Sequence, residues 1–527
     1  MRGQLLKTMK TFARCWFLLS SLCAPFFLFT QTNQPYAVPF HADEKRSERV
    51  QSMAGIIDDH FKNHAMENNY PSLVYGVLLD GKLILHGQYG NIQEGIASDK
   101  SSAYRIASMS KSVTAVCIMQ LRDAGKLRLD DPAHLYIPTL KANTLLTKDA
   151  PAITIRHLLN HAAGFPEDNP WGDRQLADTK DELTDLIKSG THFSNVPGIA
   201  FEYSNLGFAL LGQVVEKVSG KSLETYTKEK IFIPLGMSHT EWEYTKVPAV
   251  TLAHGYRYED NKHKKEELLH HGTYGAMGGL ITSIEDFAKY VALHMSAWPS
   301  RSDVENKVLK RSSLREMHLP ANFTGMSPSY RYPSGRSCGV VAAYNFGLGW
   351  LKDCEGRVYV GHSGGLPGFG SQWRILPEYG LGVISFANLT YAGTGGINLK
   401  VLDTIIQTAR LKPYEIPVSK ILSQRKNELI NLFPDWKESM VTSYSVGKSK
   451  IFAENFFPDR SAEAWRKYSI ELFNQIGAIK NIQELKPENQ LRGSFEITGE
   501  NGKINVFFTL TPENPALIQE LQMSIVK

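Results

Sequence analysis

Residues 104–111 read Tyr-Arg-Ile-Ala-Ser-Met-Ser-Lys, and a helical pattern of apolar residues begins inside this stretch. Ser108 and Lys111 are three positions apart, so they share a helical face and the amine is within reach of the hydroxyl. A serine hydroxyl is a poor nucleophile until a base removes its proton, and a lysine whose pKa is lowered by burial can be that base. The pair therefore predicts a nucleophile and its base at the N-terminus of a long amphipathic helix, where a more anionic hydroxyl is stabilised.

Two further motifs follow in chain order, Tyr203-Ser204-Asn205 and His362-Ser363-Gly364. A tyrosine can relay protons, and a glycine-containing strand edge can present backbone N–H groups to an oxyanion. Together the three motifs predict a serine hydrolase that works through an acyl-enzyme. Ser423 and Ser445 also have a lysine three residues later, but both lie beyond the linker-like stretch from Pro413 to Pro417. We therefore assign the nucleophile to Ser108.

Two alternative sites are disfavoured by their surroundings. His157 and His161 have the spacing of zinc ligands, but Leu158 stands where a zinc protease of the HExxH type carries its glutamate, so capping and packing are favoured. Residues 361–365 fit G-x-S-x-G, which would make Ser363 a nucleophile. That motif requires a following helix and a later histidine, and no histidine occurs after position 362.

Composition places the chain among ordinary globular proteins of at least two domains. It is 42% hydrophobic and 21% charged, with a net charge of +5 that arises largely in its first 14 residues. This balance gives no reason to expect a nucleic acid partner. The motifs call for no cofactor and no metal ion.

The N-terminus has the features of an export signal. Residues 1–30 contain a basic stretch and then an apolar run over 15–29, which is short for a membrane-spanning helix. We expect a periplasmic or secreted protein, with a retained membrane anchor as the alternative. Export would permit a disulfide between Cys338 and Cys354, which flank a short strand-like segment, but the sequence leaves this pairing open.

The order of expected elements predicts an α+β fold. A helical pattern covers 44–68, a β-hairpin turns at Asp80-Gly81, and strands return over 357–388 before a closing helix at 395–410. Hairpins at both ends and helices between them predict one antiparallel sheet flanked by helices, with a helical domain inserted. We expect three segments after the N-terminus. They are a hydrolase domain over 45–412, a linker over 413–430 and a small α+β accessory domain over 431–527.

With these motifs in place, the chain resembles the class C β-lactamases and D-Ala-D-Ala carboxypeptidases, together with their esterase relatives. The similarity covers roughly residues 45–410 and extends to other stretches in the family's order. These are Leu129-Asp130-Asp131-Pro132, residues 153–161, Pro234-Leu235-Gly236-Met237, Gly278-Gly279-Leu280 and Phe346-Gly347-Leu348-Gly349-Trp350.

The resemblance implies a role for each motif residue. It makes Ser108 the acylated nucleophile and Lys111 its base. It makes Tyr203 the proton relay to the leaving group and later to water, and it places Asn205 beside the lysine. It puts His362, Ser363 and Gly364 on the strand that edges the site. The oxyanion hole would consist of the N–H groups of Ser108 and Gly365.

One departure from the family bears on the substrate. Many β-lactamases carry Lys-Thr-Gly where this chain has His362-Ser363-Gly364, and a histidine is only partly charged at neutral pH. The expected substrate is therefore an ester or a peptide, including D-alanyl and peptidoglycan-derived peptides, rather than a penicillin. The alternative is a catalytically silent protein that binds a peptide or peptidoglycan ligand on the same fold. The oligomeric state is left open.

Overall fold

The structure is a computed structural model that describes residues 36–142, 146–433 and 451–526. The predicted export segment at 1–30 lies outside the described residues. Within the described ranges, no helix is both long enough and apolar enough to cross a membrane.

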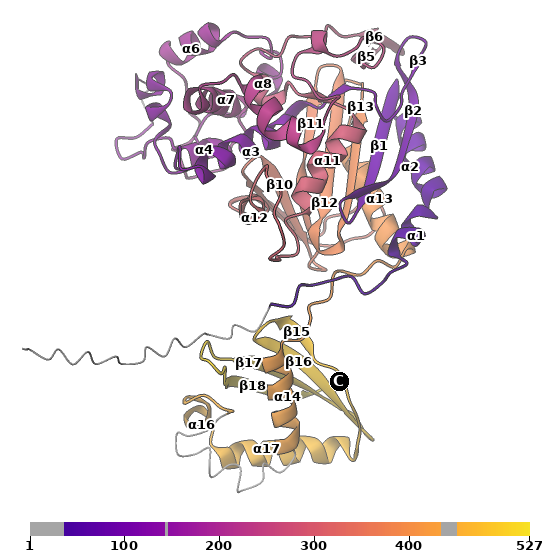
Figure 1. Ribbon diagram of the computed structural model, residues 1–527, viewed down its shortest axis with the longest axis vertical. Helices are drawn as coiled ribbons and strands as arrows, with labels where there is room; N and C mark the ends of the chain where they lie inside the picture. The colour runs from indigo at the N-terminus through magenta and orange to yellow at the C-terminus, as the bar shows by residue number, and fades with distance from the viewer. Residues whose placement is uncertain (1–35, 143–145, 434–450, 527) are drawn as a thin grey trace, which may run out of the picture. The chain divides into compact units, whose positions relative to one another are not determined.

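A nine-stranded antiparallel sheet forms the centre of the first body of the chain (Figure 1). Its strand order is β3-β2-β1-β13-β12-β11-β10-β9-β8, so strands from the two ends of the domain meet in the middle, where Leu73 pairs with Ala387. This confirms the predicted sheet. The strands are β1 (Ser72–Leu79), β2 (Lys82–Gln93), β3 (Ile96–Ala97), β8 (Asn322–Ser327), β9 (Val340–Asn345), β10 (Leu348–Asp353), β11 (Val358–Leu366), β12 (Phe369–Leu376) and β13 (Leu381–Ala387).

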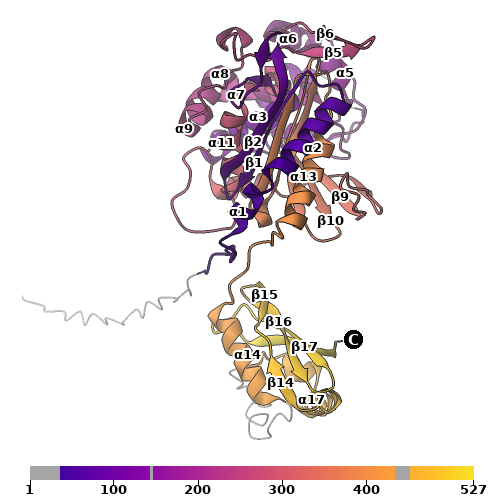
Figure 2. The ribbon, with the colours of Figure 1, turned by 90° about the vertical axis from the view of Figure 1, so that its right-hand side faces the viewer.

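Helices cover both faces of this sheet, and each face has its own apolar core (Figure 2). One face packs against α1 (Arg46–Gln51), α2 (Ala54–Glu67) and α13 (Gly395–Thr408), and the other against α11 (Ile284–Met295). The turn between β1 and β2 uses Asp80 and Gly81 at φ of 52° and 75°, as the Asp-Gly pair predicts.

The region between β3 and β8 is mostly helical, as predicted. It contains α3 (Ser110–Asp123), α4 (Ile155–Leu159), α5 (Asn169–Gly172), α6 (Lys180–Lys188), α7 (Asn205–Ser219), α8 (Leu223–Thr227), α9 (Ile233–Leu235), α10 (Gly275–Gly278), α12 (Arg311–Met317) and the 3₁₀ turn η1 (Ala107–Met109). Two short strand pairs join it, β4 (Tyr104–Arg105) with β7 (Ile281–Thr282) and β5 (Tyr256–Glu259) with β6 (Lys262–Lys265).

The helix after Ser108 differs from the expected amphipathic one. Ser108 lies in η1, and α3 begins at Ser110, two residues later than the motif suggests. Residues 110–119 are all buried, because α3 packs against α7, α10 and η1 and exposes no side over this length. Polar residues on α3 thus face neighbouring helices rather than water. Cys117 is buried here, as expected.

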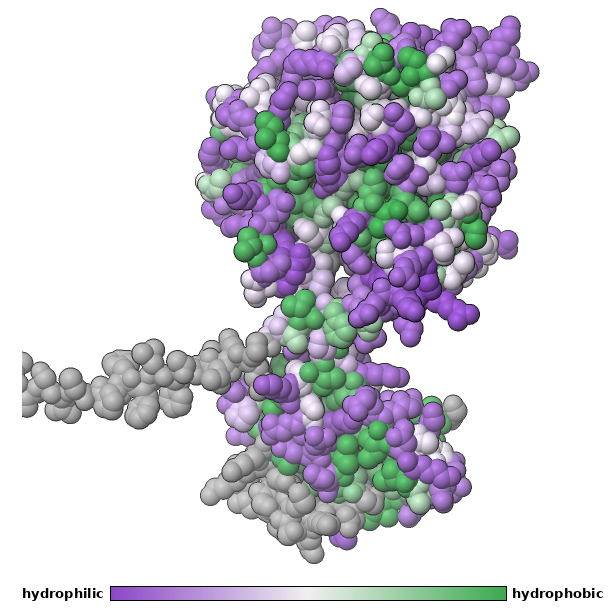
Figure 3. All heavy atoms as spheres, turned by 45° about the vertical axis from the view of Figure 1, so that its right-hand side comes forward, coloured by the Kyte–Doolittle hydropathy of each residue, from purple (hydrophilic) through white to green (hydrophobic). Residues whose placement is uncertain are grey.

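The C-terminal body is a separate α+β unit with its own apolar core. Its elements are α14 (Lys420–Leu432), α16 (Phe456–Asp459), α17 (Ala462–Ile476), β14 (Ile479–Ile482), β15 (Lys486–Asn489), β16 (Arg492–Gly499), β17 (Lys503–Leu510) and β18 (Ile518–Ile525). The expected linker at 413–430 is too long, because α14 begins at Lys420 and buries Leu422 and Leu429 in this core. Hydrophilic residues cover much of the visible surface of the chain (Figure 3).

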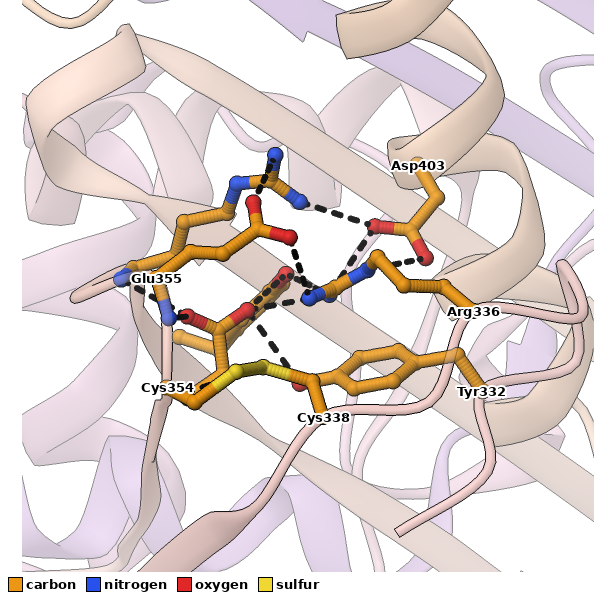
Figure 4. The surroundings of a disulfide bond; sticks show 9 residues. Tyr332, Arg336, Cys338, Cys354, Glu355 and Asp403 are labelled. Carbon is orange, nitrogen blue, oxygen red and sulfur yellow. Dashed lines mark hydrogen bonds and ion pairs between the residues drawn. A yellow bond between two sulfur atoms is a disulfide. The ribbon is translucent and has the colours of Figure 1, made fainter. Parts of the chain in front are cut away.

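The structure pairs Cys338 with Cys354, whose Cα atoms are 5.6 Å apart. The segment between them is a complete hairpin, β9–β10, rather than one short strand. Beside the disulfide, Arg336 forms ion pairs with Asp353 and with Asp403 of α13 (Figure 4). The disulfide therefore closes the base of the hairpin, and the ion pairs of Arg336 hold that base against α13.

Candidate active site

Ser108 stands at a point where the backbone is held in an unusual conformation. The preceding residue, Ala107, has a φ of 51°, a region that residues with a side chain rarely adopt. Strand β11 presses closely on this turn, since a Cβ on Gly364 would come within 2.3 Å of the Ile106 carbonyl oxygen. Glycine in the third motif is thus required for β11 to approach the nucleophile.

Lys111 is fully buried and makes three contacts through its Nζ atom. Nζ lies 3.0 Å from Ser108 Oγ, 2.6 Å from Asn205 Oδ1 and 3.0 Å from the Met277 carbonyl oxygen. The amide and carbonyl oxygens can only accept, whereas the serine hydroxyl can also donate. A neutral amine would therefore donate its two N–H groups to Asn205 and Met277 and direct its lone pair at the Ser108 hydroxyl. This is the arrangement that a general base requires.

Burial brings the pKa of Lys111 into the neutral range. Burial lowers the pKa of Lys111 to about 7, and the nearby carboxylates of Asp173 and Asp168 oppose that shift. Burial in turn raises the pKa of Asp173 to about 6, although Lys111 acts in the other direction. The two aspartates thus limit how far the pKa of Lys111 falls. Sequence reasoning missed both, since neither belongs to a motif.

Helix α7 places the second motif next to Lys111. Ser204 caps the helix by accepting from the Gly207 N–H, and Asp168 accepts from the backbone N–H groups of Asn205 and Leu206. Asn205 is the first residue of α7 and is fully buried. The capped terminus therefore fixes the amide that holds Lys111.

The Tyr203 ring lies directly over the lysine, with its centroid 4.9 Å from Lys111 Nζ. Burial raises the pKa of the Tyr203 phenol well above its usual range, and a hydrogen bond with the Ser108 side chain opposes this shift. The phenol therefore carries its proton at neutral pH. It is suited to donating a proton and not to acting as a resting phenolate base.

The histidine pair at 157 and 161 has the capping and packing roles that were favoured. His157 Nδ1 accepts from the Thr154 N–H in a capping box at the start of α4. His161 is buried and accepts from the Ser204 N–H through Nδ1. Its ring packs against that of Tyr203 at a tilt of 34°, with the centroids 4.1 Å apart. His161 thus holds both Tyr203 and Ser204 of the second motif in place.

His362 lies on β11 and is uncharged. Burial and the nearby Lys111 lower the pKa of His362 to about 3, and its Nε2 atom is 2.9 Å from the Tyr344 hydroxyl. A group in this state offers no positive charge to a substrate carboxylate. Tyr344 was not predicted from the sequence. It comes from β9, which was not expected as a separate strand.

Two adjoining cavities meet at these residues. The first, of about 360 Å³, is lined by Ser108, Asp173, Tyr203, His362, Ser363 and Gly365. The second, of about 340 Å³, shares Tyr203, His362 and Ser363 but not Ser108. The structure thus brings the predicted nucleophile, relay and strand-edge residues to one space.

The β9–β10 turn packs directly against α3, the helix that contains Lys111. A Cβ on Gly347, whose φ is 77°, would come within 2.8 Å of the Lys111 carbonyl oxygen. The Phe346 N–H donates to Asn160 Oδ1 over 2.9 Å. Residues 153–161 and 346–350, both noted for their family resemblance, therefore meet beside α3.

Comparison with known families gives one model match, to the family described as "Beta-lactamase", over residues 57–404. Among curated proteins, "Protein flp" of Staphylococcus aureus strain COL is 25% identical over 339 residues, which cover 63% of this chain and 62% of that protein. The chain thus spans about three-fifths of this relative. "Beta-lactamase-like protein 2" of Dictyostelium discoideum is also 25% identical, over 86% of this chain and 83% of its own length.

Solved structures support the same fold. The octameric penicillin-binding protein homologue from Pyrococcus abyssi aligns with a TM-score of 0.55 at 19% identity, over 90% of this chain and 99% of its own. A D-stereospecific amidohydrolase from Streptomyces sp. aligns with a TM-score of 0.53 at 23% identity, over 67% and 98%. A class C β-lactamase gives 0.53 at 20% identity, over 69% and 100%.

Proposed function

Because the chain belongs to the β-lactamase family, we propose that it is a serine hydrolase that cleaves an ester or amide through an acyl-enzyme on Ser108. The observation that carries this proposal is the position of the Lys111 amine. It is buried, its pKa is lowered to about 7, and it lies 3.0 Å from the Ser108 hydroxyl, with its other two contacts made only to acceptors.

In the proposed reaction, Lys111 Nζ takes the proton of Ser108 Oγ while Oγ forms a bond to the substrate carbonyl carbon. The carbonyl electrons move to the oxygen, and the N–H groups of Ser108 and Gly365 stabilise that oxyanion. As the bond to the leaving group breaks, the Tyr203 phenol donates its proton to the leaving atom, and Lys111 returns a proton to Tyr203. Water then attacks the ester, its proton passes back through the same groups, and Ser108 is released.

The neutral state of His362 supports esters and peptides over β-lactams as substrates. A β-lactam carries its carboxylate close to the reacting bond, where many relatives of this type place a lysine. Here that position offers an uncharged imidazole held by Tyr344. We therefore infer that p-nitrophenyl esters of short acids are cleaved faster than nitrocefin. A nitrocefin rate that equals the best ester rate would contradict this inference.

The direct test is covalent labelling of the full chain, followed by intact mass and peptide mapping. Wild type is exposed to p-nitrophenyl esters, nitrocefin and D-alanyl peptides. We expect an adduct on Ser108, none in Ser108→Ala, and retention of the Ser108 adduct in Ser363→Ala. Loss of the nucleophile should lower turnover by on the order of a million-fold. An adduct on Ser363, or a folded protein that no acylating probe labels, would overturn the proposal, and the latter would favour a silent binding protein.

We also propose that the protein works outside the cytoplasm, with peptides of the cell wall among its candidate substrates. The Cys338–Cys354 disulfide and the apolar run at 15–29 support this, because disulfides persist in oxidising compartments. Fractionation of cells that express the full chain tests it. Recovery of the protein in the cytoplasm with free thiols would contradict export.

A further inference from the structure

The Cys338–Cys354 disulfide joins an exposed residue to a buried one. Cys354 is exposed in the turn after β10, whereas Cys338, which precedes β9, is only 4% exposed. Thiol–disulfide exchange begins when a thiolate attacks one sulfur of the bond, so access decides which sulfur is attacked. An incoming thiolate therefore reaches Cys354 first.

The buried sulfur has a hydrogen-bond donor that suits it to leave. The Cys354 N–H donates to Cys338 Sγ over 3.1 Å. A hydrogen bond to sulfur favours the charged thiolate over the thiol, and a thiol of lower pKa leaves faster in exchange. Attack at Cys354 is thus matched by departure of Cys338.

The base of the hairpin keeps a second fastening when the disulfide is open. Arg336 forms ion pairs with Asp353, at the end of β10, and with Asp403 of α13. Figure 4 shows this cluster beside the disulfide. Ion pairs between side chains break and re-form, unlike a covalent bond, so reduction loosens the base of the hairpin without detaching it. This is what a reversible site requires.

Strand β9 depends on this fastening because its other neighbour is weak. It pairs with β10 on one side and with β8, the edge strand of the sheet, on the other. All six residues of β8 are at least partly exposed, and its pairing with β9 is interrupted between Phe323 and Gly325. A cross-link over a sequence separation of 16 typically shifts an opening equilibrium by about a hundredfold. Strand β9 is therefore the element that reduction frees.

The β9–β10 hairpin also shapes the proposed active site. The Tyr344 hydroxyl lies 2.9 Å from His362 Nε2, and the Tyr344 ring centroid is 4.6 Å from that of His161. Three residues of β9 line the second cavity. At the turn of the hairpin, Gly347 lies against the backbone of Lys111. Movement of β9 therefore alters the wall of the cavity and the support of the helix that carries the base.

We propose that Cys338–Cys354 is a site of thiol–disulfide exchange, and that its reduction by a dithiol releases β9 from the active site and lowers hydrolysis. One thiolate of the dithiol bonds to Cys354 Sγ, the Sγ–Sγ bond breaks, and Cys338 leaves as a thiolate that takes up a proton. The second thiolate of the dithiol then displaces Cys354, which is protonated in turn. Two electrons pass to the cysteines, and the dithiol becomes a disulfide. The effect on hydrolysis rests on the proposed function, whereas the exchange does not.

The first test asks whether the bond opens in the folded chain. The full chain is incubated with dithiothreitol, free thiols are alkylated with iodoacetamide, and the peptides are mapped by mass spectrometry. We expect Cys338 and Cys354 to be alkylated at reductant concentrations that leave the buried Cys117 unlabelled. Cleavage that occurs only together with labelling of Cys117 would show that the bond opens by unfolding, and would overturn the proposal.

The second test identifies the sulfur that is attacked. Glutathione has a single thiol, so brief incubation followed by alkylation traps the mixed disulfide. We expect glutathione on Cys354 about tenfold more often than on Cys338, because the attacking thiolate reaches the exposed residue. Adducts found mainly on Cys338 would refute the exchange as written.

The third test compares activity in oxidised, reduced and reoxidised protein. Reduction should lower kcat/KM for p-nitrophenyl esters about tenfold, because small displacements at a reacting centre are costly, and reoxidation should restore it. The double variant Cys338→Ser, Cys354→Ser should match reduced wild type. It is also the control for the reductant, since dithiothreitol should leave its rate unchanged. An unchanged kcat/KM after complete reduction of wild type would overturn the proposal.

Hydrogen exchange separates the exchange site from catalysis. Amides of β9 should exchange faster in the reduced protein, whereas those of β12 and β13, in the centre of the sheet, should not change. If no substrate is hydrolysed but β9 responds reversibly to reduction, the exchange site stands and the hydrolase proposal fails. If substrates are hydrolysed and β9 exchanges equally fast in both forms, the hydrolase stands and the release of β9 is refuted.

Discussion

The acylation rate should follow the titration of Lys111. An unperturbed lysine has a pKa of about 10.4 and would be almost entirely protonated at neutral pH. Burial lowers the pKa of Lys111 to about 7. Only the neutral amine accepts the serine proton, so the rate rises with pH and levels off above the pKa. With half of the amine neutral at about pH 7, the rate should increase roughly tenfold between pH 6 and pH 8 and little beyond.

The assay is single-turnover acylation of the full chain by a p-nitrophenyl ester from pH 5.5 to 9.5, corrected for spontaneous hydrolysis. Lys111→Arg should abolish acylation, because a guanidinium stays protonated throughout this range. Lys100→Arg, which changes an exposed lysine paired with Glu285, is the matched control. A rate that climbs tenfold per pH unit toward about pH 10 would show an unperturbed amine. Near wild-type acylation by Lys111→Arg would remove Lys111 as the base and leave Tyr203 as first candidate.

Three further predictions concern the supports of the site. Gly364→Ala should abolish acylation and lower the melting temperature, because its Cβ would clash with the Ile106 carbonyl oxygen. Gly393→Ala is the control and should change neither, because Gly393 has open space around it. A chain ending at Pro417 should remain folded and acylate normally, because the C-terminal core contains no earlier residue; a folded truncation that no longer labels would contradict this. Replacing Cys338 and Cys354 by serine should cost about 3 kcal/mol of unfolding free energy, the amount typical of a loop this long, measured by denaturant titration against wild type.

The sequence predicted those parts of the site that are encoded locally. Ser108 and Lys111 belong to one turn of chain, so spacing alone brought them together. Asp173 and Tyr344 acquire their surroundings only through tertiary contacts, and no short motif marks either one. The boundary at 420 was missed because the apolar residues of α14 were included in a polar linker.

Local sequence signals also failed to predict β9 and β10 as separate strands. Each has six residues, and their pairing depends on the tight turn at Phe346-Gly347, where the glycine was noted only as part of a resemblance. The two hairpins at the ends of the domain were predictable because alternating apolar residues surround clear turn signals.

Closure of the central sheet has a consequence for how the protein is made. Strand β1 pairs with β13 residue by residue, from Leu73 with Ala387 to Leu79 with Leu381. At typical rates of about 5–20 residues per second, roughly 15–60 s separate the emergence of these strands from the ribosome, because roughly 300 residues lie between them. During that interval one edge of β1 has no native partner and is open to mispairing. The domain must therefore fold after its synthesis is almost complete, and chaperones that hold nascent chains unfolded should increase its yield.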